Sequence, residues 1–300
     1  DVIKVGRTCL QDAVPLTLEQ EFGGYAEFCR RQAANIRSLR EECFSLIVGG
    51  TAVGTGLGAA PGYQEAFYKH LSAQLGEDVK SATDLFDGMQ NDDFCVKVSA
   101  AVKQAACGIS KIAKDIRLMS SGPRAGLGEI SIPSLSPGSS IMPGKINPIL
   151  PELVSQVAQQ TCGNDVVISM AFEQGELEIS VWAPTLYKNL FESFDLLTKV
   201  IPLFIDKCVS GITANREKCA QEARETIALA TVVAATLGYP EGVRVAKYAQ
   251  QHNLAVADAV LKMGVMTKEE ADSLLDPALL VNPERMAEAI AQWKAEKRHA

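Results

Sequence analysis

The sequence predicts an all-α protein, built as a bundle of long helices with a small helical C-terminal domain. Apolar residues recur every three or four positions over several stretches of more than about twenty residues, which is the spacing of one helix face. Strand-like patterns are few and short. Residues 1–210 are predicted to form the bundle, and residues 211–300, where the predicted helices shorten, the C-terminal domain.

The elements of the bundle follow from this periodicity and from capping residues. Residues 1–15 are predicted to be a polar segment that stops at Pro15. Thr17 and Gln20 form a capping box for the first helix, and residues 49–62 form a glycine-rich loop. Helices are expected over residues 17–46, 61–75, 90–120, 148–171 and 184–209, and short strands over 129–132 and 177–181.

Helix-terminating and helix-starting residues lie close together in the C-terminal third. Gly238 and Gly264 each end a helix, because glycine accepts the left-handed conformation that follows a last turn. Thr267 and Glu270 form a second capping box, and Pro283 starts the last helix. Short helices at this spacing predict a small helical domain.

Composition excludes several classes of partner. The net charge is −7, from 29 basic and 36 acidic residues, which argues against a nucleic-acid partner. No apolar run reaches membrane length and no signal peptide is recognised, so no membrane partner is expected. Eight scattered cysteines without a Cys-x-x-Cys pair are typical of reduced thiols, and a cytoplasmic location is expected.

The most informative stretch is the glycine-, serine- and proline-rich segment at residues 137–148. Its composition predicts a mobile loop, and Pro148 lies where the next helix starts. The loop carries Ser139, Ser140, Lys145 and Asn147 to that helix start, a position that attracts anions. The two serines are also ordinary turn residues, and composition alone favours that interpretation.

Two other interpretations of the sequence are rejected. The segment from Gly138 to Lys145 is one residue too long for a phosphate loop, and Ile146 stands where Ser or Thr is required. A metal site or a Ser-His-Asp triad is not predicted, because no histidine lies in a motif. The three histidines are His70, His252 and His299.

Residues 138–148 resemble the signature loop of the aspartase/fumarase superfamily, and residues 6–13 and 121–127 resemble two further segments of it. Residues 147–152 are more similar to the aspartase branch than to the fumarase branch. The resemblance covers nearly the whole chain and implies an ammonia-lyase reaction that converts L-aspartate to fumarate without a cofactor. By the same resemblance, Cys9 occupies a position that is usually His in fumarases and His or Gln in aspartases, and a cysteine there suits loss of ammonia better than loss of hydroxide.

The same resemblance assigns roles to individual residues. It makes Ser139 the general base, since an ionised serine needs surrounding dipoles and a cation, and the reacting carboxylate needs donors for its second charge. It implies substrate contacts from Thr8, Ser140, Lys145 and Asn147, and supporting roles for Cys9 and Glu152. Glu152 is equally explained as a favourable charge near a helix N-terminus.

The resemblance further implies a small dicarboxylate or amino-acid substrate and a homotetramer whose active sites are shared between subunits. It places another substrate-binding segment before Asp1, and we expect the protein to extend in that direction. Three alternatives remain open: a class II fumarase, a non-catalytic structural relative, and an enzyme that acts on a modified aspartate.

Overall fold

The computed structural model describes residues 1–299, and it is mainly α-helical, so the predicted fold class is confirmed. The described residues form two compact units. Unit 1 comprises residues 1–25, 119–131 and those from Ile212 onward; unit 2 comprises residues 26–118 and 132–211. No helix among the described residues is long and apolar enough to cross a membrane.

The elements in chain order are β1 Ile3–Thr8, β2 Gln11–Thr17, α1 Leu18–Ser38, η1 Glu41–Phe44, β3 Ser45–Leu46, α2 Tyr63–Leu75, β4 Lys80–Ser81, α3 Leu85–Gln90, α4 Asp93–Met119, β5 Ile130–Ser131, α5 Ile149–Glu173, α6 Ala183–Lys207, η2 Val209–Gly211, β6 Thr213–Ala214, α7 Arg216–Glu225, η3 Ile227–Leu229, α8 Ala230–Leu237, α9 Tyr239–His252, α10 Val256–Lys262, α11 Lys268–Leu274, α12 Pro277–Leu280 and α13 Pro283–His299.

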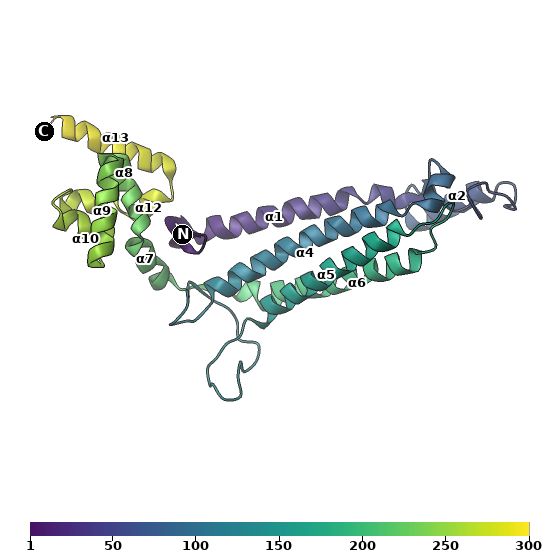
Figure 1. Cartoon of the computed structure of the whole chain (residues 1–300), viewed down its shortest axis with the longest axis horizontal. Coiled ribbons are helices and arrows are strands. Elements are labelled where there is room, and N and C mark those ends of the chain that lie inside the picture. Colours follow the sequence, from purple (N-terminus) through teal and green to yellow (C-terminus); the bar gives the residue numbers. More distant parts are fainter. Residues whose placement is uncertain (300) are drawn as a thin grey trace. The chain divides into compact units, whose positions relative to one another are not determined.

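Unit 2 is organised around the long helices α4, α5 and α6, which run lengthwise beside most of α1 (Figure 1). Their apolar faces bury one continuous cluster, so the helical periodicity of the sequence becomes a shared core. Polar contacts add specificity inside it, since the amide Nδ2 of Asn164 donates to Ser193 Oγ at 3.0 Å between α5 and α6. The fully buried members of the cluster include Ile168 and Leu186.

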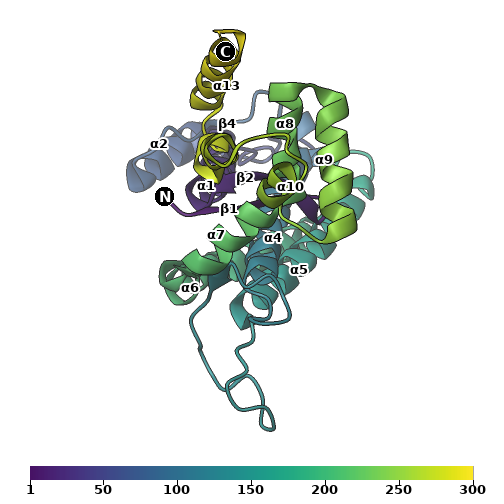
Figure 2. The same ribbon diagram turned by 90° about the vertical axis from the view of Figure 1, so that its left-hand side faces the viewer.

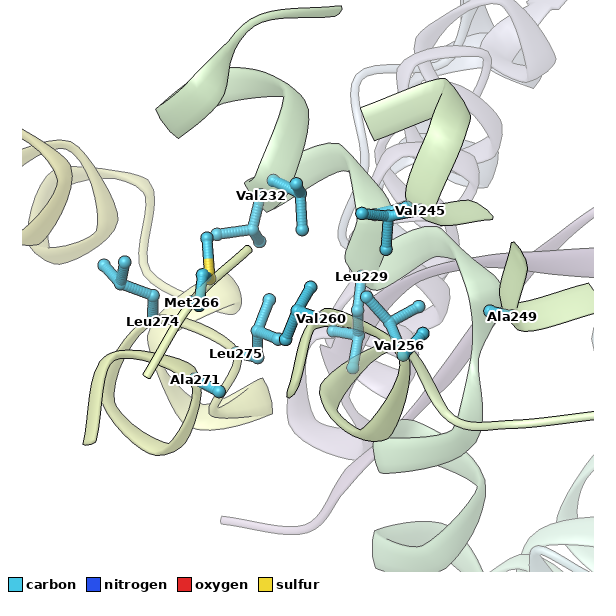
Figure 3. Close-up of a cluster of buried hydrophobic side chains, with 13 residues drawn as sticks. Leu229, Val232, Val245, Ala249, Val256, Val260, Met266, Ala271, Leu274 and Leu275 are labelled. Carbon is cyan, nitrogen blue, oxygen red and sulfur yellow. The ribbon is translucent and has the colours of Figure 1, made fainter. Parts of the chain in front are cut away.

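Unit 1 has a second core, made by the short helices α8 to α11 with apolar residues of α13 packed against it (Figure 3). Val232, Val245, Val256 and Val260 are completely buried there. The predicted capping box is present: Thr267 accepts from the Glu270 backbone N–H, and the Glu270 carboxylate accepts from the Thr267 N–H. These two hydrogen bonds satisfy backbone donors at the start of α11 and stabilise this short helix.

The long predicted helices are confirmed, with ends moved by a few residues. The first capping box is also confirmed, because Gln20 N–H donates to Thr17 Oγ1 at 3.0 Å and Thr17 N–H to Gln20 Oε1 at 2.9 Å. The helix predicted over residues 17–46 is too long, since α1 ends at Ser38 and the chain continues through η1 and β3. Ser45 and Leu46 then pair with Lys80 and Ser81 of β4.

Two segments differ from the prediction. Residues 1–15, predicted as a polar segment that stops at Pro15, contain β1 and most of β2, an antiparallel hairpin that continues through Pro15 and whose residue Val5 is buried. The strand predicted over residues 177–181 is absent, and only one bridge between Glu176 and Ile179 occurs there. The chain makes a turn between these two residues and forms no extended strand there. The division into domains at residues 210 and 211 stays a prediction.

Candidate active site

Residues 132–148 of unit 2 form a loop that projects beyond the N-terminus of α5 (Figures 1 and 2). Its two sides are joined near the base, where Gly138 N–H donates to the Lys145 carbonyl at 3.0 Å. A Cβ atom on residue 138 would lie 2.1 Å from the Lys145 carbonyl oxygen, so this close approach requires glycine. The loop lines an open, shallow pocket of about 470 Å³, whose lining includes Ser139 and Lys145.

Ser139 lies in a tight turn inside this loop and is half-buried. Its Oγ accepts from the backbone N–H groups of Ile141 and Met142, each at 3.2 Å. Hydrogen bonds to an oxygen favour its charged form, so these two donors suit a serine that has to lose its proton. Ser140, the neighbouring hydroxyl, is exposed to solvent.

Lys145 and Asn147 complete the polar set of the loop. Lys145 is exposed to solvent. The amide Nδ2 of Asn147 donates to the Gly138 carbonyl at 2.7 Å and therefore fastens the base of the loop. Ser139, Lys145 and Asn147 all lie in this loop, and their roles stay a prediction.

Glu152 lies in the first turn of α5, where a negative charge interacts favourably with the helix dipole. Its carboxylate also meets the guanidinium of Arg117 on α4, at 3.3 Å. Both side chains are partly exposed, so this contact is a surface ion pair.

Thr8 and Cys9 lie in unit 1, at the tip of the β1–β2 hairpin. Cys9 and Leu10 make the two-residue turn, with φ angles of 54° and 59°. Both angles are left-handed, a conformation that such turns usually assign to Asn and Gly and that costs about 1–2 kcal/mol for other residues. The turn leaves the Thr8 and Cys9 side chains exposed.

The hairpin is held by an ion-pair network that the sequence analysis missed. Arg7, next to the turn, donates from Nη1 to Glu129 at 2.6 Å and from Nη2 to Glu222 at 3.0 Å. Glu129 is fully buried, and the Lys4 ammonium lies 3.4 Å from its Oε1. Burial alone would lower the pKa of Arg7, but the hydrogen bond and charge of Glu129, with help from Glu222, raise it above its ordinary value. No local sequence signal joins residues so far apart.

Among the described residues, no group of three or more His, Cys, Asp or Glu side chains is placed to hold a metal ion. The candidate residues fall into two separate sets, one in each unit. The serine loop offers a candidate base, donors and a cation, and the hairpin tip offers a hydroxyl and a thiol.

Comparisons with known proteins place this arrangement among helical lyases. The family described as "Lyase" matches residues 1–163, and that described as "Fumarase C C-terminus" matches residues 229–287. An aspartate ammonia-lyase from Bacillus sp is 42% identical over 94% of this chain and 60% of its own length. A class II fumarate hydratase from Halalkalibacterium halodurans is 40% identical over 95% of this chain and 62% of its own.

Solved structures agree with this class. A class II fumarase from Schistosoma mansoni has a TM-score of 0.90 at 33% identity, over 94% of this chain and 62% of its own. A structure titled fumarate lyase:delta crystallin from Brucella melitensis has a TM-score of 0.90 at 39% identity, over 94% and 61%. The chain belongs to the aspartase/fumarase family of lyases. It spans about 60% of the length of the curated relatives it matches.

Proposed function

We propose that the protein is an ammonia-lyase that interconverts L-aspartate with fumarate and ammonia. The observation that carries the proposal is the identity to Bacillus aspartate ammonia-lyases over nearly the whole chain. Cys9 supports it, because an amine bound as –NH₃⁺ leaves as neutral ammonia and needs no histidine acid at that position.

In this proposal, Ser139 removes the proton from the carbon next to the substrate's β-carboxylate. The electron pair moves onto that carboxylate, which then carries a second negative charge, and the bond to nitrogen breaks in the following step. Lys145 and the loop amides are donors of the kind that stabilise such a charge. Asn147 would contact the carboxylate after it releases Gly138, which assigns the loop a closing motion on substrate binding.

The test measures the ultraviolet absorbance of fumarate with L-aspartate and L-malate offered separately. It uses the protein with whatever flanking sequence its gene encodes. We expect product from aspartate, and a loss of about 10²–10⁴-fold in kcat for Ser139→Ala, the usual contribution of a general base. Ser134→Ala is the matched control, because Ser134 is a serine of the same loop whose Oγ donates to the Ser136 carbonyl at 3.5 Å and to which no role is assigned. Equal rates for the two variants would refute the assignment of the base.

A second candidate is a class II fumarase, which the Halalkalibacterium relative and the Schistosoma structure favour. Product from malate alone would establish it. If the lack of a histidine acid at position 9 limits hydration, Cys9→His should raise any fumarate-hydrating activity. An unchanged hydrating activity would mean that Cys9 is no argument against a fumarase. No fumarate absorbance with either substrate would favour an enzyme that acts on a modified aspartate, or a non-catalytic relative.

We also propose that copies of the chain associate as a homotetramer through α5 and α6. Val166 and Met170 on α5 and Phe191 on α6 are 56%, 64% and 62% exposed, and Tyr187 stacks on Phe191. Apolar side chains this exposed on two long helices favour burial against other subunits. Phe191→Glu should shift the mass measured by light scattering from the tetramer toward smaller species, whereas Lys188→Glu on the same helix should not. A monomeric wild-type protein would refute the association.

A further inference from the structure

The β1–β2 hairpin is held just below its tip by two residues that lie one helical turn apart. Glu222, on α7, accepts from Nη2 of Arg7 on β1 at 3.0 Å. Thr226, which follows α7, donates from Oγ1 to the carbonyl of Ala13 on β2 at 3.3 Å. The Thr226 backbone N–H donates to the Glu222 carbonyl at 3.1 Å, so the spacing of the two residues is fixed. The end of one helix therefore holds both strands of the hairpin.

The hairpin is held where its strand pairing is irregular. The pairing register shifts between Val5 and Arg7, which places a β-bulge beside Gly6. A Cβ atom on Gly6 would lie 2.5 Å from the Val14 carbonyl oxygen, so this close approach requires glycine. A bulge bends a strand and changes the direction of the side chains that follow it. The tip that carries Thr8 lies beyond the bulge, so its direction depends on the contacts made there.

Both holding residues are themselves fixed by further contacts. The Glu222 carboxylate also meets the ammonium of Lys218, one turn earlier on α7, at 2.7 Å. Thr226 is 1% exposed, and its Oγ1 also accepts from the Ala228 N–H at 3.2 Å. A side chain that is locked by packing and by a second polar contact can keep a neighbouring group within about 0.5 Å of its place. Glu222 and Thr226 therefore have the properties of a support for the hairpin tip.

We propose that Glu222 and Thr226 are positioning residues that hold the hairpin tip where the reaction needs Thr8. This inference rests on the proposed lyase function, in which Thr8 contacts the substrate. Each positioning residue acts through the strand that it holds, Glu222 through Arg7 and Thr226 through the Ala13 carbonyl. A hydrogen bond to a charged substrate group is worth about tenfold or more in binding, so a displaced Thr8 should raise KM by about that factor.

The test compares Thr226→Val with Thr226→Ser and Thr236→Val, each in the protein with its flanking sequence. Thr236 is the matched control, because it is buried in the same unit and its hydroxyl donates to the Val232 carbonyl within α8 at 2.7 Å. With the substrate that the wild type converts, we expect Thr226→Val to raise KM about tenfold and to change kcat by less than about threefold. Thr226→Ser, which keeps the hydroxyl, and Thr236→Val should both remain near the wild-type values.

Urea unfolding should show similar losses of stability for Thr226→Val and Thr236→Val, because each removes one buried hydroxyl hydrogen bond. A difference in KM between them then reports position and not stability. Glu222→Ala, which removes the contact with β1, should raise KM in the same direction as Thr226→Val.

A second measurement does not depend on activity. Amide hydrogen exchange over residues 7–13 should be faster in Thr226→Val and Glu222→Ala than in the wild type, and unchanged in Thr236→Val. Unchanged exchange in the first two variants, or faster exchange without a rise in KM, would overturn the inference. A wild type that converts neither aspartate nor malate would instead refute the proposed function, and the exchange rates would then decide alone whether Glu222 and Thr226 hold the tip.

Discussion

The ion pair that anchors the hairpin gives a quantitative prediction for Arg7→Met. Methionine has a similar length but no charge, so the substitution leaves the Glu129 carboxylate, 0% exposed, without its 2.6 Å partner. Removing one member of a buried ion pair costs about 3–5 kcal/mol. Lys4 remains 3.4 Å from Glu129, and we therefore expect the lower end, about 3 kcal/mol. For a chain of this size that corresponds to a fall in Tm of about 5 °C.

Thermal and urea unfolding of the variant, followed by circular dichroism, measure this cost. Arg244→Met is the matched control, because its pair with Glu241 is at the surface, where an ion pair contributes little to stability. The double variant Arg7→Met/Glu129→Gln should be more stable than Arg7→Met alone, since it no longer buries a carboxylate without its partner. Equal losses for Arg7→Met and Arg244→Met, or a double variant less stable than Arg7→Met, would refute the reasoning.

Two further predictions concern helices of the two units. Gly108→Ala on α4 should destabilise the chain by about 1–3 kcal/mol, because the new Cβ would lie 1.8 Å from the Phe28 ring; Gly163→Ala on α5 meets nothing and should be neutral or stabilising in the same urea titration. The hydrogen bond from Lys297, with one from the Thr267 backbone, lowers the pKa of Glu270 to about 2. This stabilisation is complete above pH 4.5 and lost as the pH falls through 2, so Trp293 fluorescence should change between these values in the wild type and not in Glu270→Gln.

The fold was predictable from sequence where its signal is periodic and local. The helices α4, α5 and α6 each present an apolar face over many turns, so their existence follows from spacing alone. The β1–β2 hairpin was not predictable in this way. Its turn, formed by Cys9 and Leu10, lacks the usual Asn-Gly signal of a two-residue hairpin. The strand expected over residues 177–181 is absent for a different reason. The composition of this segment favours a strand, but the segment forms a turn closed by one bridge between Glu176 and Ile179.

The candidate site residues show the same difference between local and long-range sequence signals. Ser139, Lys145 and Asn147 lie within nine residues of each other, so a reader of the sequence can group them. The partners of Arg7 lie 122 and 215 positions away, and only the folded chain brings them together.

The network also bears on the identity of residue 9. A turn built for stability alone would use Asn-Gly, whereas Cys9 and Leu10 both adopt left-handed angles at a cost. Arg7 offsets that cost from outside the turn, by fixing β1 to Glu129 and Glu222. Turn geometry therefore does not explain a cysteine at this position, and within the proposed lyase reaction we infer a role for its side chain. Cys9→Asn tests this inference: it should keep or raise the Tm and lower the activity with aspartate, and unchanged activity would show that the thiol has no such role.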